Sequence, residues 1–315
     1  MSNYSQLFSS LLEKKKIPSK KVIELLMKLK EYLLEENNIL FINGPVAVVG
    51  DIHGQFYDLL ELFKQAGYEN IPNSAPPRKF VCLGDYVDRG HYGLEVVLSL
   101  FLLKLMYPAH FVLLRGNHEC RTITQNYGFY EECFNHYQDL NIWKAIMCVF
   151  DVLPIGAVVD QTIFCVHGGL SPHAFNFFEI KNLWRFQEIP TSGGLCDLLW
   201  SDPTHEIENW TPSPRLSGWL FGEKVVDEFL EINKINLICR SHQLAPKGYY
   251  WWFEDDPFKP TKKKICTVWS APNYLYTNKN EASVLFLENG QVDKFITFQA
   301  SPNDPNHKLV SNEND

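Results

Sequence analysis

Three short polar clusters of the 315-residue sequence carry side chains that can hold metal ions. The clusters are GDIHG, GDYVDRG and GNHE, and the donors in them are Asp51, His53, Asp85, Asp88, Asn117 and His118. Oxygen and imidazole donors together suit borderline-hard ions such as manganese, iron or zinc. Because the clusters lack cysteine, they do not indicate a structural zinc site. The neighbouring glycines let the backbone turn sharply and approach a ligand closely.

Two further histidines are candidates for the same site. His167 in CVHGG and His242 in CRSHQ each follow an apolar, strand-like run. A single Asp after a strand usually caps the next helix, and a single His in a strand is more often a hydrogen-bonded core residue. The three clusters together change this balance, because their occurrence in this order by chance has odds on the order of one in a billion. We therefore interpret these residues as one set.

The apolar pattern predicts the elements that position the clusters. Segments 45–51, 79–85 and 110–117 each run from apolar residues into one polar cluster, and a helical pattern follows each of them. Strand, loop and helix in this order predict parallel strands covered by helices. Ligands of such sheets bind beyond the carboxyl ends of the strands. Short β runs between 155 and 298 predict a second sheet, and a packing helix is expected over 19–36.

The chain shows no stretch of linker composition, so we expect a single domain over residues 1–300. Its core should span about 46–298, with N-terminal helices within 1–40. The polar segment 301–315 is expected to be a disordered or loosely docked tail. The expected fold class is α+β, with two packed mixed β-sheets in a sandwich flanked by helices.

Composition excludes several classes of protein. With 45% hydrophobic and 14% aromatic residues, the chain is not disordered, collagenous or a coiled coil. A net charge of −8 gives no electrostatic footprint for nucleic acid, and no apolar stretch is long enough for a membrane span. The N-terminus shows no secretory signal, and the eight cysteines are widely spaced. We therefore expect reduced thiols and a cytoplasmic protein, with the nucleus as a second compartment.

Six motifs together resemble those of the phosphoprotein phosphatase family of serine/threonine protein phosphatases. They are GDIHGQ (50–55), GDYVDRG (84–90), RGNHE (115–119), HGGLSP (167–172), WSDP (200–203) and SAPNY (270–274). The resemblance runs from about residue 46 to residue 298 and is closest to the type 2A, 4 and 6 branch, with some calcineurin-like features. It implies the calcineurin-like phosphoesterase fold and the metal-dependent hydrolysis of phosphoserine and phosphothreonine in proteins.

The resemblance also implies a pair of metal ions that share one carboxylate. The residues that would hold them are Asp51, His53 and Asp85 for one ion, and Asp85, Asn117, His167 and His242 for the other. The ions would be Mn²⁺ in vitro and iron, zinc or manganese in the cell. They would polarise a bridging water to hydroxide, which attacks phosphorus directly without a phosphoenzyme.

The remaining roles concern the leaving group and the phosphate. By resemblance, His118 would donate a proton to the leaving alkoxide, with Asp88 orienting its imidazole. Arg89 and Arg215 would clamp the phosphoryl oxygens, and Tyr274 would lie near the metal ions. We expect a structural role for Arg115. Two roles remain possible for Asp202 and Asn273: these residues either support the metal ligands or shape turns.

Three positions depart from the family pattern. Trp184 stands where the family usually has Asp, Leu216 stands where Gly usually follows the clamp arginine, and Leu275 replaces the Cys of the type 2A branch. Trp184 and Leu216 motivate a second hypothesis, an inactive or weak scaffold that has kept the fold. A third hypothesis is a metallophosphoesterase of small phosphate esters or nucleotides, because GDxHG and GNHE alone also fit that activity.

The expected partners are phosphoprotein substrates together with regulatory or targeting subunits, and neither nucleic acid nor a membrane. No long amphipathic helix follows residue 298, so a calcium-binding B-type subunit and calmodulin are not expected. Residues 249–266 are longer than the type 2A branch requires and predict an extended hairpin.

Overall fold

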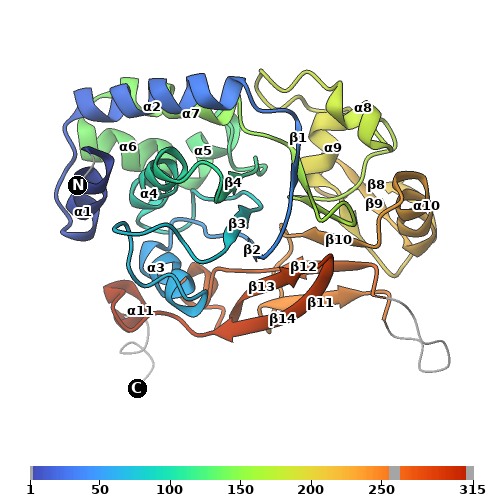
Figure 1. Ribbon diagram of the computed structural model, residues 1–315. Helices are drawn as coiled ribbons and strands as arrows, with labels where there is room; N and C mark the ends of the chain where they lie inside the picture. Colours follow the sequence, from blue (N-terminus) through green and yellow to red (C-terminus); the bar gives the residue numbers. More distant parts are fainter. Residues whose placement is uncertain (1–2, 255–262, 310–315) are drawn as a thin grey trace.

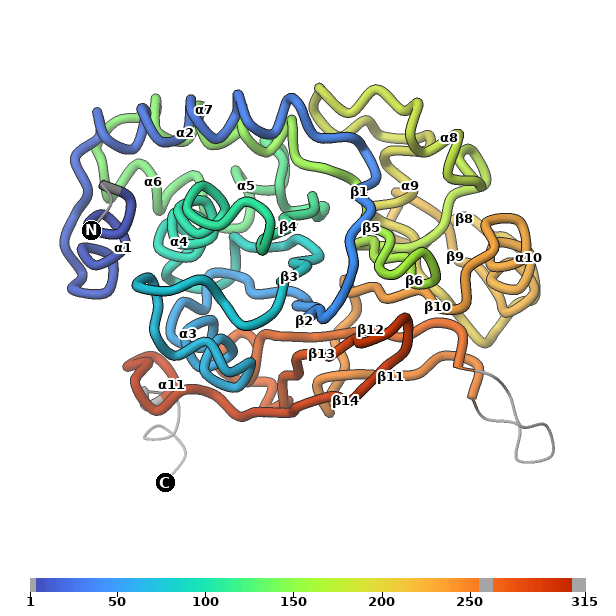
Figure 2. Tube along the Cα trace, in the orientation of Figure 1, coloured from blue at the N-terminus to red at the C-terminus, as the bar shows by residue number. Residues whose placement is uncertain are grey.

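Two β-sheets packed against each other form the centre of the molecule, and helices cover their outer sides (Figures 1 and 2). The computed structural model describes residues 3–254 and 263–309. A buried apolar layer between the sheets takes side chains from both of them. The predicted sandwich of mixed sheets flanked by helices is therefore confirmed.

The first sheet has five strands in the order β14-β13-β2-β3-β4. Its strands are β2 (Val46–Val49), β3 (Lys79–Cys82), β4 (Phe111–Leu113), β13 (Ala282–Glu288) and β14 (Gln291–Phe298). β2, β3 and β4 pair in parallel as predicted, whereas β13 and β14 are antiparallel additions. β2 is buried on both faces, since Val46 and Val48 pack between the sheets and Ala47 and Val49 pack under helices.

The second sheet has six strands in the order β1-β5-β6-β10-β12-β11. Its strands are β1 (Ile39–Ile42), β5 (Gly156–Val159), β6 (Ile163–Val166), β10 (Leu237–Arg240), β12 (Ile265–Val268) and β11 (Tyr249–Trp252). The last two β runs of the sequence, expected here, instead join the first sheet as β13 and β14. A small third sheet of β7 (Asp202–Pro203), β9 (Trp219–Phe221) and β8 (Trp210–Pro212) was not predicted.

Helices form two groups on the outer sides of the sheets (Figure 1). The first group is α1 (Asn3–Leu12), α2 (Ser19–Leu34), α3 (Phe56–Gln65), α4 (Gly93–Met106), α5 (Arg121–Tyr127), α6 (Phe129–Tyr137) and α7 (Leu140–Phe150). The second group is α8 (Phe177–Lys181), α9 (Gly194–Trp200) and α10 (Glu223–Asn233). α4 is apolar on nearly all sides because the other helices of its group surround it. None of the described helices has the length and apolarity needed to cross a membrane.

The segment after β14 folds back onto the body. Ser301 and Asp304 are buried, and α11 (Pro305–Leu309) lies beside α3 (Figure 1). The expectation of a loosely docked tail is therefore wrong for residues 301–309, while residues 310–315 lie outside the described part. β11 and β12 pair antiparallel as the expected hairpin requires, but its tip, residues 255–262, also lies outside the described residues.

Trp184 and Arg185 have opposite environments. The Arg185 guanidinium is buried and donates hydrogen bonds to the carbonyls of Val152, Leu33 and Glu36 at 3.1, 2.9 and 2.5 Å. A fourth bond runs to the Asn38 side chain at 2.7 Å, so Arg185 joins the end of α2, the start of β1 and the end of α7. Trp184 is 66% exposed. The tryptophan that departs from the family pattern therefore lies at the surface, and its neighbour Arg185 makes the buried hydrogen bonds that join these elements.

We predict that Arg185→Ala lowers the free energy of unfolding by about 3 kcal/mol, because it leaves buried carbonyl groups without donors. Trp184→Asp, the matched control at the exposed neighbour, should change it by less than about 0.5 kcal/mol. Urea denaturation of the two variants measures the difference. Equal losses in both variants would contradict the assigned role of Arg185.

Candidate active site

The predicted metal ligands converge beyond the carboxyl ends of strands from both sheets. The loops after β2, β3 and β4 supply Asp51 and His53, Asp85 with Asp88, and Asn117 with His118, while His167 follows β6 and His242 follows β10. All of them are at most 9% exposed. The structure thus brings together every residue that the sequence predicted as a metal ligand.

Asp85 lies between two groups of ligand atoms. Its Oδ2 faces His53 Nε2 at 3.7 Å, and the same His53 nitrogen lies 3.5 Å from Asp51 Oδ2. Its Oδ1 faces His167 Nε2 at 3.3 Å, and that nitrogen lies 2.8 Å from Asn117 Oδ1. Donor atoms of Asp85, His167 and His242 lie within 4.8 Å of one another. One carboxylate is therefore shared by two potential ion sites.

Backbone carbonyls orient two of the imidazoles. His53 Nδ1 lies 3.0 Å from the Val87 carbonyl oxygen, and His167 Nδ1 lies 3.1 Å from that of Leu83. A carbonyl oxygen only accepts, so Nδ1 of each ring carries the proton and donates. Nε2 of both rings then points at the carboxylates, which is the arrangement that prepares an imidazole for a metal ion.

The electrostatics of the cluster favour a cation. Burial opposes charge on His53, yet Asp51 and Asp85 raise the pKa of its imidazole to about 9. Burial and the nearby Arg215 instead lower the pKa of His242 well below its usual value, and its buried Nε2 has no hydrogen-bond partner among the described residues. A neutral imidazole whose buried nitrogen has no hydrogen-bond partner in the described part of the chain, beside carboxylates, fits a divalent metal ion.

Close backbone packing sets the distance between two of the loops. A side chain at Gly84 would place Cβ 2.4 Å from the Gly116 nitrogen, and one at Gly116 would place Cβ 2.3 Å from Asp85 Oδ1. Glu119 ties the same loops by accepting from the backbone N–H of Asp85, Tyr86 and Gly116 at 2.7 to 2.9 Å. Burial and the nearby Asp85 raise the pKa of Glu119 to about 8. Sequence reasoning assigned no role to Glu119, although it ends the RGNHE motif.

Left-handed backbone at non-glycine residues is concentrated in these loops. The site residues with positive φ are His53, Asp85, Asp88, Arg89, His242, Asn273, Leu275 and Tyr276. Such conformations persist only where surrounding contacts fix them. The ligand directions therefore depend on the packing of the loops as much as on residue type.

His118 and Asp88 form the predicted pair. His118 Nδ1 lies 2.7 Å from Asp88 Oδ2, and the other Asp88 oxygen accepts from the Phe129 N–H at 3.0 Å. His118 Nε2 faces the metal ligands, 4.0 Å from Asp85 Oδ2. The ring is thus fixed with one nitrogen on a buried carboxylate and the other toward the centre of the site.

The two clamp arginines are held differently. The exposed Arg89 places its guanidinium 4.0 Å from the centre of the Tyr127 ring. Arg215 Nε donates to Asp202 Oδ2 at 2.6 Å, and buried Arg240 donates to the other Asp202 oxygen at 2.8 Å. Asp202, left open between a supporting and a turn role, therefore orients Arg215. Sequence reasoning missed Arg240, which had no motif-based signal beyond its place before His242.

Leu216 and Arg115 also have defined environments. Leu216 has φ +64° and is 93% exposed, so it adopts the left-handed backbone that the usual glycine allows, and its side chain faces solvent. Arg115 is fully buried and donates to the Glu119 carbonyl and to Asp151, which fits the expected structural role. Tyr274 lies with its ring 5.1 Å from that of His53, and burial raises its pKa.

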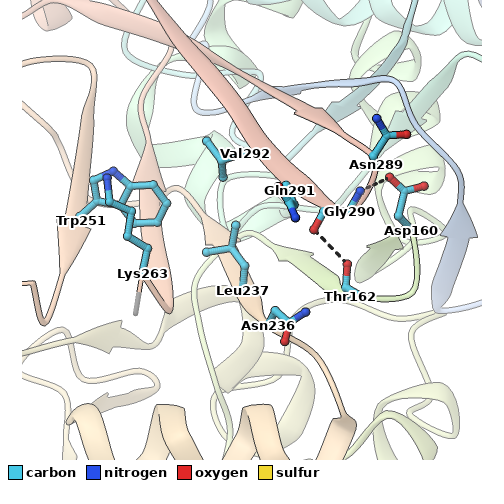
Figure 3. A pocket seen from close by; sticks show the side chains of 10 residues that line it. All are labelled: Asp160, Thr162, Asn236, Leu237, Trp251, Lys263, Asn289, Gly290, Gln291 and Val292. Atoms are coloured by element: carbon cyan, nitrogen blue, oxygen red, sulfur yellow. Dashed lines mark hydrogen bonds between the residues drawn. The ribbon is translucent and has the colours of Figure 1, made fainter. Parts of the chain in front are cut away.

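A separate pocket lies at the other end of β10 and contains none of the predicted site residues (Figure 3). Leu237, the first residue of β10, lines it, whereas His242 follows the last residue of that strand. Asp160 and Thr162 bond there to the N–H and carbonyl of Gly290 at 2.8 and 3.3 Å. These contacts join two turns and supply no ligands to the metal cluster.

We predict that Mn²⁺ raises the melting temperature of the metal-stripped chain and that Asp85→Asn removes most of this rise. Binding to the folded state alone stabilises by about 2.7 kcal/mol at a hundredfold excess over Kd. His173→Asn is the matched control, because half-exposed His173 also faces a buried carboxylate, Asp197, but lies outside the cluster. Calorimetric scans with and without Mn²⁺ test this, and an unchanged rise in Asp85→Asn would contradict the shared-carboxylate site.

Known proteins resemble the chain over most of its length. The sequence profile of the calcineurin-like phosphoesterase family matches residues 44–246. Serine/threonine-protein phosphatase ppe1 of Schizosaccharomyces pombe is 48% identical over 286 residues, which cover 91% of this chain and 89% of that protein. The serine/threonine-protein phosphatase 6 catalytic subunit of Caenorhabditis elegans is 47% identical over 297 residues, 94% of this chain and 85% of that one.

A solved structure agrees with these matches. A protein serine/threonine phosphatase from Saccharomyces cerevisiae with similarity to human phosphatase PP5 superposes with a TM-score of 0.83 at 32% identity. The superposition covers 97% of this chain and 98% of the yeast chain. The likeness therefore includes both sheets and the loops that carry the site.

Proposed function

The chain belongs to the calcineurin-like phosphoesterase family, and from this premise we propose that it is a metal-dependent serine/threonine protein phosphatase. The observation that carries the proposal is the Asp85 carboxylate between two ligand groups, with the His118–Asp88 pair directly beside it. That arrangement combines a place for metal ions with a place for a proton donor, as the hydrolysis of a phosphate ester requires.

The residues that would hold metal ions are Asp51, His53, Asp85, Asn117, His167 and His242. Their donors are oxygen and imidazole nitrogen, which suit Mn²⁺ in vitro and iron, zinc or manganese in the cell. Such ions supply Lewis-acid chemistry, polarising water and the phosphoryl oxygens. The buried, left-handed loops keep these donors in place before substrate arrives.

His118 is the residue we assign to the leaving group. Asp88 accepts from Nδ1–H, so Nε2 is the nitrogen that faces the reacting centre and transfers the proton. The ionised Asp88 also stabilises the positive imidazolium from which that proton leaves. The alkoxide of serine or threonine is a strong base and needs this proton in order to depart.

Arg89 and Arg215 are the groups we assign to the phosphoryl oxygens. Guanidinium groups bind such oxygens through paired N–H donors. Burial, and after it the positive charge of Arg215, lower the pKa of His242, so the clamp arginine acts electrostatically on a metal ligand. The Tyr274 ring lies 5.1 Å from that of His53, so Tyr274 borders the same space.

The structure gives no support to the scaffold hypothesis at the two positions that motivated it. Trp184 lies at the surface beside buried Arg185, and Leu216 adopts the required left-handed backbone without displacing Arg215 from Asp202. The hypothesis of small phosphate esters shares the metal ligands, so substrate preference must separate it from a protein phosphatase.

We expect the Mn²⁺-loaded chain to hydrolyse a phosphothreonine peptide with a kcat/KM at least about 100-fold above that for a dinucleoside polyphosphate. The threonine alkoxide that leaves from the peptide needs the proton that His118 donates. The relatives are also named serine/threonine-protein phosphatases. Phosphate release from both substrates measures the ratio. A preference for the dinucleotide would favour the small-ester hypothesis, and no turnover of either by the metal-loaded, folded chain would favour the scaffold.

We predict that His118→Asn lowers kcat on the phosphothreonine peptide by about 10²- to 10⁴-fold, the usual range for general acid catalysis. The loss on p-nitrophenyl phosphate should be much smaller, because nitrophenolate departs without a proton. The matched control is His110→Asn, a histidine just before β4. Equal losses on the two substrates would contradict the assignment of His118 as the proton donor.

A further inference from the structure

The C-terminal segment 301–307 is hydrogen-bonded to α3 and to the loop before α4. The Ser301 N–H donates to Asp58 Oδ1 at 2.7 Å, and His307 Nε2 lies 3.0 Å from Asp58 Oδ2. Asn306 donates to the Tyr92 hydroxyl at 3.1 Å. Asp58 lies in the first turn of α3, directly after the GDIHGQ loop, and α11 lies beside that helix (Figure 1). Segment 301–307 is thus bonded to elements that follow the metal-binding loops.

His307 links this segment to the loop that carries Tyr274. The Lys279 N–H donates to Asn273 Oδ1 at 3.0 Å, which fixes the amide with its Nδ2 toward His307 Nδ1, 3.1 Å away. His307 Nδ1 must therefore accept, and Nε2 carries the proton that is donated to Asp58. The imidazole acts as a neutral bridge between Asp58 and Asn273.

This tautomer argues against a cation at the same place. Ligand atoms of Asp58, Asp304 and His307 lie within 4.8 Å of one another, as in a metal site. A metal ion on Nε2 would require the proton on Nδ1, where it would face the Asn273 NH₂ group. The hydrogen-bond network therefore assigns His307 to a bridge and not to a metal ligand.

The loop beyond Asn273 depends on such support. Asn273, Leu275 and Tyr276 all have positive φ, a conformation that surrounding contacts must maintain. The Tyr274 N–H donates to Asn280 Oδ1 at 2.8 Å, and the Tyr274 ring lies against His53. Displacement of Asn273 would therefore move the side chain that covers a metal ligand.

A second contact joins His307 to the phosphate-binding loop. The Tyr276 ring lies between those of His307 and His91, with centres 4.9 Å apart on both sides. His91 follows Arg89 by two residues, and its N–H points at the Tyr276 hydroxyl at 3.4 Å. His307 is thus linked to the loop of Tyr274 through Asn273 and to the loop of Arg89 through the ring of Tyr276.

We propose that His307 is a positioning residue of the phosphatase reaction, which acts through Asn273 on Tyr274. The expected effect on turnover rests on the proposed function, whereas the effect of His307 on the loop geometry is independent of that function. It gives the C-terminal segment a direct part in shaping the site.

Two substitutions separate the two bonds of His307. Asn places an amide oxygen near the position of Nδ1, so His307→Asn can keep the acceptor for Asn273 while losing the bond to Asp58. Gln reaches the position of Nε2, so His307→Gln can keep the donor for Asp58 while losing the acceptor for Asn273. Asn303→Ala is the matched control, because Asn303 is exposed in the same segment and bonds to Ser301 Oγ through its backbone N–H, which alanine keeps.

We expect His307→Gln to lower kcat on the phosphothreonine peptide roughly tenfold with KM changed less than about twofold, because small misplacements near the reacting atoms cost rate. His307→Asn should keep kcat within about twofold although it loses the docking bond to Asp58. Backbone amides of residues 271–280 should exchange with deuterium faster in His307→Gln than in His307→Asn or Asn303→Ala.

Three outcomes would overturn the proposal: unchanged kcat in both His307 variants, equal losses in both, or equal exchange of residues 271–280 in all variants. A wild-type chain without turnover would count against the proposed function alone. In that case the exchange rates still decide whether His307 holds the loop.

Discussion

The position of the Asp85 carboxylate is the constraint on which the two halves of the site depend. Its Oδ2 faces His53 and its Oδ1 faces His167, and Oδ1 also accepts a hydrogen bond from the backbone N–H of His118 at 2.9 Å. Its own backbone is left-handed and is held by Glu119. Only a glycine at 116 leaves room for this carboxylate, so the ligand and the space around it are fixed together.

This arrangement requires both sheets at once. The first sheet supplies the loops that carry Asp51, Asp85 and Asn117, whereas His167 and His242 follow strands of the second. The apolar layer between the sheets holds the two sets of strand ends at one edge of the sandwich. Burial of several carboxylates and imidazoles costs free energy, and a bound cation offsets that cost. Folding energy from the core thus maintains a site that is unfavourable by itself.

The sequence was sufficient for the parts of the site that lie in local motifs. Asp51, His53 and Asp85 follow strands whose apolar pattern is readable, so their common edge could be predicted. Contacts between segments distant in the sequence could not be predicted, because no local pattern indicates them. Ser301 bonds to Asp58 across 243 positions, and the polar composition of its segment suggested a loose tail. The bridging role of Asp202 and the outward direction of Trp184 also became clear only from packing.

The site must attract a phosphate dianion although the chain as a whole carries a net charge of −8. Asp202 makes this possible at Arg215, because its single negative charge is shared with a second guanidinium, that of buried Arg240. The group of three therefore keeps one positive charge. Arg89 is held by the face of the Tyr127 ring, a contact that orients a guanidinium without neutralising it. Both arginines are thus positioned by partners that leave positive charge for the substrate, and this local field opposes the repulsion expected from the net negative charge of the chain.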